Sequence, residues 1–164
     1  MAGQLTAPEV GSADIPAVVV HEFGQGRVVY LPGRLDALQC YELTPAIERL
    51  FGDAVKWLMH GRLPIEVGSP GMVGVGYFQQ PQRLIVHLVN HNRDSRFRDD
   101  GYQPLLHVVV RLRLPAGFDA ARVHRLWTPS DLACRRDGDC LTAELDRIDE
   151  YEALAVELRP AAAR

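Results

Sequence analysis

The chain has 164 residues, of which 47% are hydrophobic and 24% charged, and its formal net charge is −3. This is the composition of a globular protein and excludes a largely disordered chain, while a pI near 6.0 argues against a general nucleic-acid-binding protein. No apolar run approaches the roughly 20 residues of a membrane span, and the first residues lack the pattern of a secretory signal. We therefore expect a cytoplasmic protein without a membrane or nucleic-acid partner.

The first part of the chain predicts a lead-in followed by a strand pair. Residues 1–14 are rich in small residues and predict a flexible lead-in. Residues 17–20 are continuously apolar, as in a strand that is buried on both faces. A turn containing Gly24 and Gly26 separates them from a second strand at residues 27–31, which ends at Pro32 and Gly33. Two strands joined so tightly should form a hairpin.

A helix is predicted between Thr44 and Gly61. Thr44 is a suitable N-cap, Pro45 suits the first helical position because its missing N–H is not needed there, and Gly61 is the expected C-terminal stop. One apolar stripe recurs at helical spacing: Ile47, Leu50, Phe51, Ala54, Val55 and Leu58. The stripe has to pack on something, and the preceding strand pair is the nearest candidate.

After Gly61 the hydrophobic period changes from helical to alternating. Strands are expected at residues 72–78, 83–89, 105–114, 122–127, 132–135, 140–145 and 153–158. In the third of these, Val108, Val110, Leu112 and Leu114 face one way and His107, Val109, Arg111 and Arg113 the other. Short strands with frequent turn signals are typical of a sandwich or barrel. The sequence therefore predicts a mainly β chain, in which a small α/β remnant (residues 15–61) precedes an antiparallel β-sandwich (residues 62–160).

The cysteines and histidines form no pattern that predicts a metal or cofactor site. Cys40, Cys134 and Cys140 are too few for a disulfide framework. Cys134 and Cys140 flank a predicted turn at Asp137 and Gly138, and a three-residue loop would place their thiols opposite each other across a hairpin, in a redox state that the sequence leaves open. On a regular strand His87 and His91 would lie about 13 Å apart, too far for one metal ion. We expect them, with His107, on a solvated sheet face.

Several acidic residues raise the alternative of a small hydrolase. They are Asp99, Asp100, Asp146, Asp149, Glu150 and Glu152. Glycoside cleavage needs two carboxylates roughly 5–10 Å apart in a cleft, one of them with a raised pKa. Acids along a loop or strand entry more often keep a sheet edge soluble. No catalytic residue is therefore assigned.

The polar stretch of residues 90–103 is the candidate binding loop, because it is too long for a simple hairpin connection. Its aromatic residues are Phe97 and Tyr102, and aromatic rings stack on sugar faces. We expect these two side chains, with Asp99 and Asp100, to contact carbohydrate. Tyr77 and Trp127 are expected instead to be core anchors between the sheets.

Four stretches of the chain resemble one family of bacterial enzymes. They are residues 15–33 (IPAVVVHEFGQGRVVYLPG), residues 50–57 (LFGDAVKW), residues 83–90 (RLIVHLVN) and residues 149–152 (DEYE) before an apolar strand. The first two are similar to the end of the glutamine-amidotransferase-like trimerisation domain of β-galactosidase-type glycoside hydrolases, where a strand pair ends at Pro-Gly and a helix ends near "ANAVRW". The last two resemble the β-sandwich that follows, with its "LLVHLVN" strand.

The resemblance implies a chain without catalytic residues of its own, since the barrel that carries them in the family would precede these residues. It implies a non-catalytic accessory or oligomerisation module of a glycoside-hydrolase-like protein of carbohydrate metabolism. Such a module would associate with itself or dock onto a catalytic domain. The alternative is a stand-alone carbohydrate-binding module that uses residues 90–103.

Overall fold

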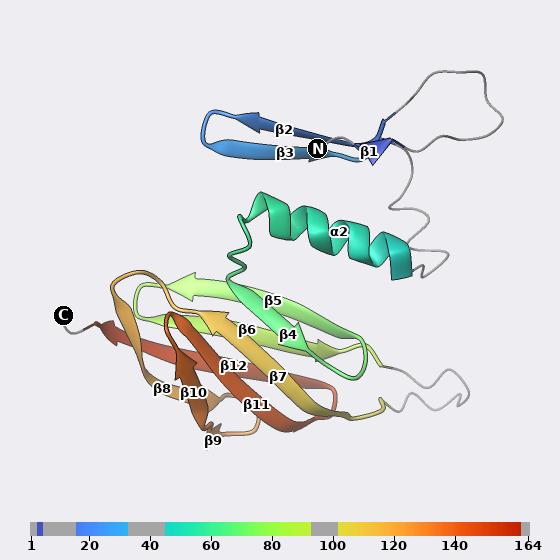
Figure 1. Ribbon diagram of the computed structural model, residues 1–164. Coiled ribbons are helices and arrows are strands. Elements are labelled where there is room, and N and C mark those ends of the chain that lie inside the picture. Colours follow the sequence, from blue (N-terminus) through green and yellow to red (C-terminus); the bar gives the residue numbers. More distant parts are fainter. Residues whose placement is uncertain (1–2, 5–15, 33–44, 93–101, 162–164) are drawn as a thin grey trace. The chain divides into compact units, whose positions relative to one another are not determined.

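The computed structural model describes residues 3–4, 16–32, 45–92 and 102–161. The chain is divided into two compact units, which we call unit 1 (Met1–Leu63) and unit 2 (Pro64–Arg164) (Figure 1). Strands dominate the described residues, and the predicted fold class, a β-sandwich preceded by a strand pair and one helix, is confirmed. Within the described ranges no helix has the length and apolar character that crossing a membrane requires.

Unit 1 contains a hairpin and a helix. The strands β2 (Pro16–Phe23) and β3 (Gly26–Tyr30) pair in antiparallel fashion around the turn residues Gly24 and Gln25. Gly24 has a φ of 59°, and glycine at the first position of a two-residue turn is the arrangement of a type II′ hairpin. A two-residue strand, β1 (Gly3–Gln4), pairs with β2 inside the segment predicted as a lead-in. The rest of that segment lies outside the described residues, as does Cys40.

One face of this hairpin is packed and the other is exposed. Arg27 on β3 donates from Nη1 to the Trp57 carbonyl over 2.8 Å, and its guanidinium lies 4.6 Å from the centre of the Trp57 ring. On the opposite face, which we call the hairpin face, Phe23, Val28 and Tyr30 are 77%, 52% and 61% exposed. The first strand was predicted to be buried on both faces, but Val18, Val19 and Val20 are only half-buried. Among the described residues of unit 1, only one side of the hairpin has a packing partner.

The helix α2 (Pro45–Leu58) forms where its pattern predicts it. Its apolar stripe is half-buried along most of its length, although Val55 is exposed. The left-handed turn that ends the helix begins one residue before the glycine predicted to stop it, because His60 has a φ of 51° and Gly61 a φ of 70°. The Gly61 N–H donates to the Lys56 carbonyl and the His60 N–H to the Trp57 carbonyl, which is a Schellman motif. The proposed N-cap, Thr44, lies outside the described residues.

Unit 2 is a sandwich of two antiparallel sheets (Figure 1). One sheet has the order β10 (Cys134–Asp137), β11 (Cys140–Ile148), β7 (Leu105–Arg113) and β4 (Ile65–Gly68). The other has the order β5 (Val73–Gln80), β6 (Arg83–Asn90), β12 (Tyr151–Pro160), β8 (Phe118–Arg125) and β9 (Ser130–Asp131).

The core of unit 2 lies between these sheets, because both contribute fully buried side chains to one cluster. Leu84, Val86 and Leu154 come from the five-stranded sheet, and Val110 and Leu145 from the four-stranded sheet. The predicted alternation in β7 is confirmed, with Val108, Val110 and Leu112 buried and Val109 and Arg111 exposed. In unit 1, by contrast, none of the side chains at residues 18–32 and 45–63 is fully buried. Unit 2 therefore holds a complete core of its own.

Candidate functional site

Four rings form a continuous row across the five-stranded sheet. Phe78 on β5 meets His87 on β6 edge to face, with ring centroids 5.3 Å apart. His87 stacks on Tyr151 of β12 at 6.0 Å, and Tyr151 meets Trp127 edge to face at 5.5 Å. We call these residues the aromatic row. Such geometries are the favourable ones for aromatic pairs.

The aromatic row lies on the sheet face that points away from the core. Successive side chains of a strand point to opposite faces, and His87 stands between Val86 and Leu88, which are fully buried in the core. Phe78 likewise follows Tyr77, which packs against the core. The prediction of Tyr77 as a core residue is therefore supported, and burial raises the pKa of its hydroxyl.

The prediction of Trp127 as a core anchor is wrong, because its side chain is 69% exposed. The strand expected at residues 122–127 ends at Arg125, so Trp127 lies beyond β8 in the connection to β9. The Leu126 N–H donates to the Ala153 carbonyl over 2.8 Å, which fixes the backbone just before Trp127. The exposed ring is thus presented by a backbone that is bound to β12.

A buried carboxylate holds the backbone of Trp127 in place. Oε1 of Glu152 accepts hydrogen bonds from the N–H groups of Trp127 at 3.0 Å and Ala153 at 2.9 Å. Oε2 accepts from the Arg125 guanidinium, with Nε at 2.7 Å and Nη2 at 2.6 Å. Burial opposes ionisation of Glu152, but the hydrogen bonds from Arg125, Ala153 and Trp127 outweigh it, and the pKa of Glu152 is lowered. A carboxyl in this state is a structural anion and is unsuited to the role of general acid.

Beside Trp127 the surface is hollowed over about 180 Å³. This Trp127 hollow is lined by Trp127, Thr128, Arg147, Asp149, Glu150 and Tyr151, among others. Arg147 pairs with Asp149, with Nε and Oδ1 2.8 Å apart. The carboxylate of Glu150 forms no hydrogen bond or ion pair within the part of the chain that the structure describes. The hollow therefore combines an aromatic wall with charged groups and a free acceptor.

Two glycines on β5 make room for histidine rings over the sheet. A Cβ atom on Gly74 would lie 2.6 Å from Nε2 of His91, and one on Gly76 would lie 3.4 Å from Cβ of His87. His87 also shares a hydrogen bond between Nδ1 and the Tyr151 hydroxyl at 2.6 Å. His87 and His91 thus lie over Gly76 and Gly74 of β5. The expected solvated position is found for His91 and His107, which are exposed, whereas His87 is half-buried.

The predicted carbohydrate contacts lie mostly where the structure gives no description. Phe97, Asp99 and Asp100 lie outside the described residues, so the structure does not bring them together with other groups. Tyr102 is described, half-buried and in contact with other residues just before β7. None of these positions tests the predicted binding loop.

Asn90, the first residue of the stretch predicted as a binding loop, is fully buried and holds the base of that stretch. Nδ2 of Asn90 donates to the carbonyls of Gln103 at 2.7 Å and Asp149 at 2.5 Å, and Oδ1 accepts from the Asn92 N–H at 2.8 Å. Buried amides are normally satisfied in this way. Asn90 thereby connects the ends of the stretch at residues 90–103 to the turn between β11 and β12.

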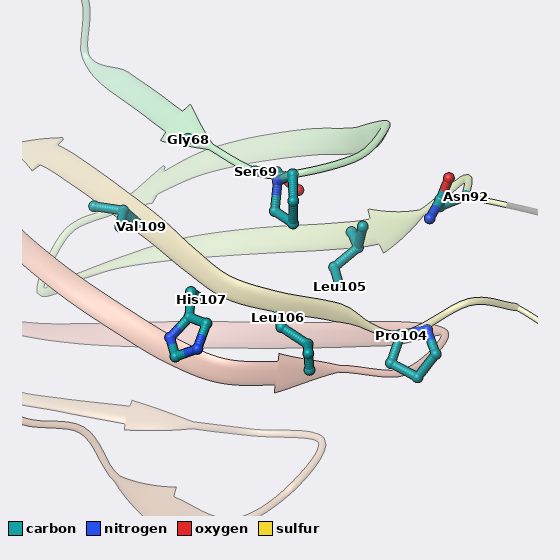
Figure 2. Close-up of a pocket in the computed structure, with 9 residues that line it drawn as sticks. Gly68, Ser69, Asn92, Pro104, Leu105, Leu106, His107 and Val109 are labelled. Atoms are coloured by element: carbon teal, nitrogen blue, oxygen red, sulfur yellow. The ribbon is translucent and has the colours of Figure 1, made fainter.

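A second hollow, of about 580 Å³, opens at this base (Figure 2). Its lining comes from the end of β4, the end of β6 and the start of β7, with Pro104, Leu105, Leu106 and Val109 as apolar members. Its polar lining residues are Ser69, Asn92 and His107. It offers an apolar surface but no converging set of reactive groups.

The thiols of Cys134 and Cys140 do not lie opposite each other, because the hairpin loop has two residues and not the three that this arrangement requires. Asp137 pairs with Cys140, so the turn residues are Gly138 and Asp139, and Cys134 pairs with Ala143 instead of Cys140. Both thiols are free, and burial raises the pKa of Cys134, so this thiol is protonated at neutral pH. In the described ranges no group of three or more His, Cys, Asp or Glu side chains could hold a metal ion.

No model of a protein family matches the chain, and no curated protein does. Among solved structures the chain is similar to α-L-fucosidase isoenzyme 2 from Paenibacillus thiaminolyticus, with a TM-score of 0.70, 19% identity and coverage of 93% of this chain. A cycloisomaltooligosaccharide glucanotransferase from a Paenibacillus species matches 57% of this chain and 16% of its own, with 15% identity and a TM-score of 0.47. The chain spans only 23% of the length of the fucosidase chain. The fold of this protein is therefore one that occurs as part of a much larger glycoside hydrolase.

Proposed function

We propose that this chain is a non-catalytic accessory module of a glycoside-hydrolase-related protein, and that unit 1 mediates its association. The observation that carries the proposal is the exposed hairpin face of unit 1, together with the lack of any fully buried side chain at residues 18–32 and 45–63. A lone hairpin and one helix bury little apolar surface, and exposed apolar patches on such elements usually mark an interface. The fold likeness to part of a glycoside hydrolase supports the kind of protein to which the module would belong.

The finer assignment is to the end of the trimerisation domain and the following β-sandwich of a β-galactosidase-type enzyme, as the sequence resemblance implies. The hairpin sequence supports it, because its continuous apolar run is typical of a strand covered on both faces. Among the described residues of unit 1 only one face of the hairpin is packed, and a second copy of the chain would cover the other. Docking onto a catalytic domain is the other possible use of the same face.

Sedimentation velocity over a range of protein concentrations tests the association. We expect reversible self-association that Val28→Asp weakens at least about tenfold, or about 1.4 kcal/mol, because a carboxylate would have to be buried at the interface. Val75→Asp is the matched control, since Val75 is also an exposed strand valine, at 43%, but belongs to β5 in unit 2. A monodisperse monomer that binds no hydrophobic dye would contradict the proposal, whereas a monomer that binds the dye through the hairpin face would indicate docking onto a different domain.

A further inference from the structure

The aromatic row is unusual because its two ends are open to solvent. Trp127 is 69% and Phe78 57% exposed, while His87 and Tyr151 between them are half-buried. The large apolar rings at the ends gain little from packing, and exposed apolar surface that is arranged in a continuous patch commonly marks a binding site. The sheet beneath the row is rigid, since β6 and β12 pair over seven consecutive positions. The rings of His87 and Tyr151 therefore stand on paired strands, and the backbone of Trp127 is held by Glu152.

The Trp127 hollow adds polar groups at one end of this surface. Arg147 and Asp149 lie on its rim, and the Glu150 carboxylate has no partner among the described residues. Thr128 supplies a hydroxyl, which can both donate and accept. A volume of about 180 Å³ is well below the roughly 300–1,000 Å³ of pockets that enclose drug-sized ligands. The hollow has room for one small ring.

The charges around the hollow disfavour an anionic ligand. Two guanidinium groups, Arg125 and Arg147, face three carboxylates, Asp149, Glu150 and Glu152. Each guanidinium already has a carboxylate partner, and the remaining charge is the negative one on Glu150. A ligand carboxylate or phosphate would therefore meet repulsion instead of a free cation.

We propose that the Trp127 hollow and the aromatic row bind a neutral saccharide. The C–H face of one sugar ring would lie on the negative face of the Trp127 ring, and its hydroxyls would donate to the Glu150 carboxylate and exchange hydrogen bonds with Thr128. Further units of an oligosaccharide would extend along the row toward Phe78. A protein partner fits less well, because the centre of a protein interface is normally depleted of charged residues, and here charges lie next to the most exposed ring.

This inference goes beyond the accessory role of unit 1 and depends on residues of unit 2 alone. The chain has two tryptophans, Trp57 and Trp127, which makes a direct test possible. In Trp57→Phe the single remaining indole is Trp127, and in Trp127→Phe it is Trp57 on α2. Each variant is titrated with glucose, galactose, mannose, xylose, L-fucose and their neutral disaccharides while acrylamide quenching of tryptophan fluorescence is measured.

We expect at least one neutral sugar to protect Trp127 from acrylamide in Trp57→Phe, with no change in Trp127→Phe. In the Trp57→Phe background, Glu150→Gln should weaken binding because the amide is a poorer acceptor than the carboxylate. By calorimetry, Trp127→Ala should lower the affinity at least about tenfold, because the ring on which the sugar would stack is removed. Glu144→Gln, an exposed acid on β11 outside the hollow, is the matched control and should bind as the unmodified chain does.

Two results would overturn the inference. One is the absence of protection by every sugar in the panel, with the fold of the variant verified by circular dichroism. The other is protection by glucuronic acid or inorganic phosphate in preference to neutral sugars, which would indicate an anion site. Neither result affects the self-association of unit 1, and loss of self-association in Val28→Asp leaves the sugar titration unchanged, so the two proposals fail separately.

Discussion

Glu152 connects the stability of the sandwich with the position of the exposed Trp127 ring. The carboxylate is fully buried and accepts hydrogen bonds from Arg125 and from the backbone N–H groups of Trp127 and Ala153. Buried ion pairs add little over an apolar replacement, but removal of one partner leaves an uncompensated charge. We therefore regard Glu152 as a positioning residue whose loss affects the fold first and the Trp127 surface as a consequence.

Glu152→Gln should lower the free energy of unfolding by about 3 kcal/mol at neutral pH, because Arg125 loses its anionic partner. The pKa of Glu152 in the folded protein lies below its usual value of 4.5. The contribution of the ionised carboxylate is therefore complete above pH 4.5 and is lost as the pH falls through the folded-state pKa. Urea unfolding at several pH values should show the difference between the two proteins constant at neutral pH and smaller in acid.

Asp131→Asn provides the control for this measurement. Asp131 pairs with Arg122 at 2.6 Å, but their side chains are 70% and 59% exposed. Exposed pairs of this kind contribute less than about 1 kcal/mol. A loss for Asp131→Asn as large as that for Glu152→Gln would show that burial of the carboxylate is not the cause.

At single positions the sequence predicts burial along regular strands better than at strand ends. The alternation of Val108, Val110 and Leu112 places them in the core because a strand with one buried face has a period of two. Trp127 follows the end of β8, where that period no longer applies, and its size suggested the core. Its exposed position depends on Glu152, a distant residue, and no local pattern reveals such a contact.

Among the elements, α2 carries a glycine in its middle that the structure does not require. A Cβ atom on Gly52 would meet nothing within 4 Å, and the residue is exposed. Gly52→Ala should therefore stabilise the helix by up to about 1 kcal/mol, since alanine loses less backbone entropy on folding. Unfolding of the Trp127→Phe variant, followed by Trp57 fluorescence, measures this effect directly.

Gly61→Ala should have the opposite sign in the same assay. Its φ of 70° is in the left-handed region, where alanine is strained even though a Cβ atom would have open space. Equal shifts for the two substitutions would mean that the unfolding of Trp57 does not report on α2.

The hairpins illustrate which part of an element can be predicted. Gly138 marks the turn, and a strand forms on each side of it, but the first covers Cys134–Asp137 instead of the expected residues 132–135. The identity of the two turn residues decides the register, and the sequence fits both Asp137-Gly138 and Gly138-Asp139. A shift of one residue changes every cross-strand pair, so the pairing of Cys134 with Ala143 could not be derived from the turn signal alone.

At the scale of the whole molecule, the two units differ in what stabilises them. Unit 2 has a core of fully buried side chains from both sheets, and unit 1 has none at residues 18–32 and 45–63. We expect two unfolding transitions in urea, with unit 1 unfolding first because less apolar surface is removed from water. Trp57 in Trp127→Phe reports on unit 1, and Trp127 in Trp57→Phe reports on unit 2.

The slope of each transition is a second readout of the same difference. The dependence of the unfolding free energy on urea scales with the surface exposed, so the Trp57 transition should be shallower than the Trp127 transition. Coincident midpoints and equal slopes at low protein concentration would contradict the assignment of separate stabilities.

The exposed hairpin face predicts that the stability of unit 1 depends on protein concentration. If a second copy covers Phe23, Val28 and Tyr30, then the folded form of unit 1 is stabilised by mass action, and its melting temperature rises with total protein concentration. The melting temperature of the sandwich should not depend on protein concentration, because its core lies within a single chain. In a dilute solution unit 1 would therefore unfold at a lower temperature, while the sandwich, with its proposed saccharide surface, would stay folded.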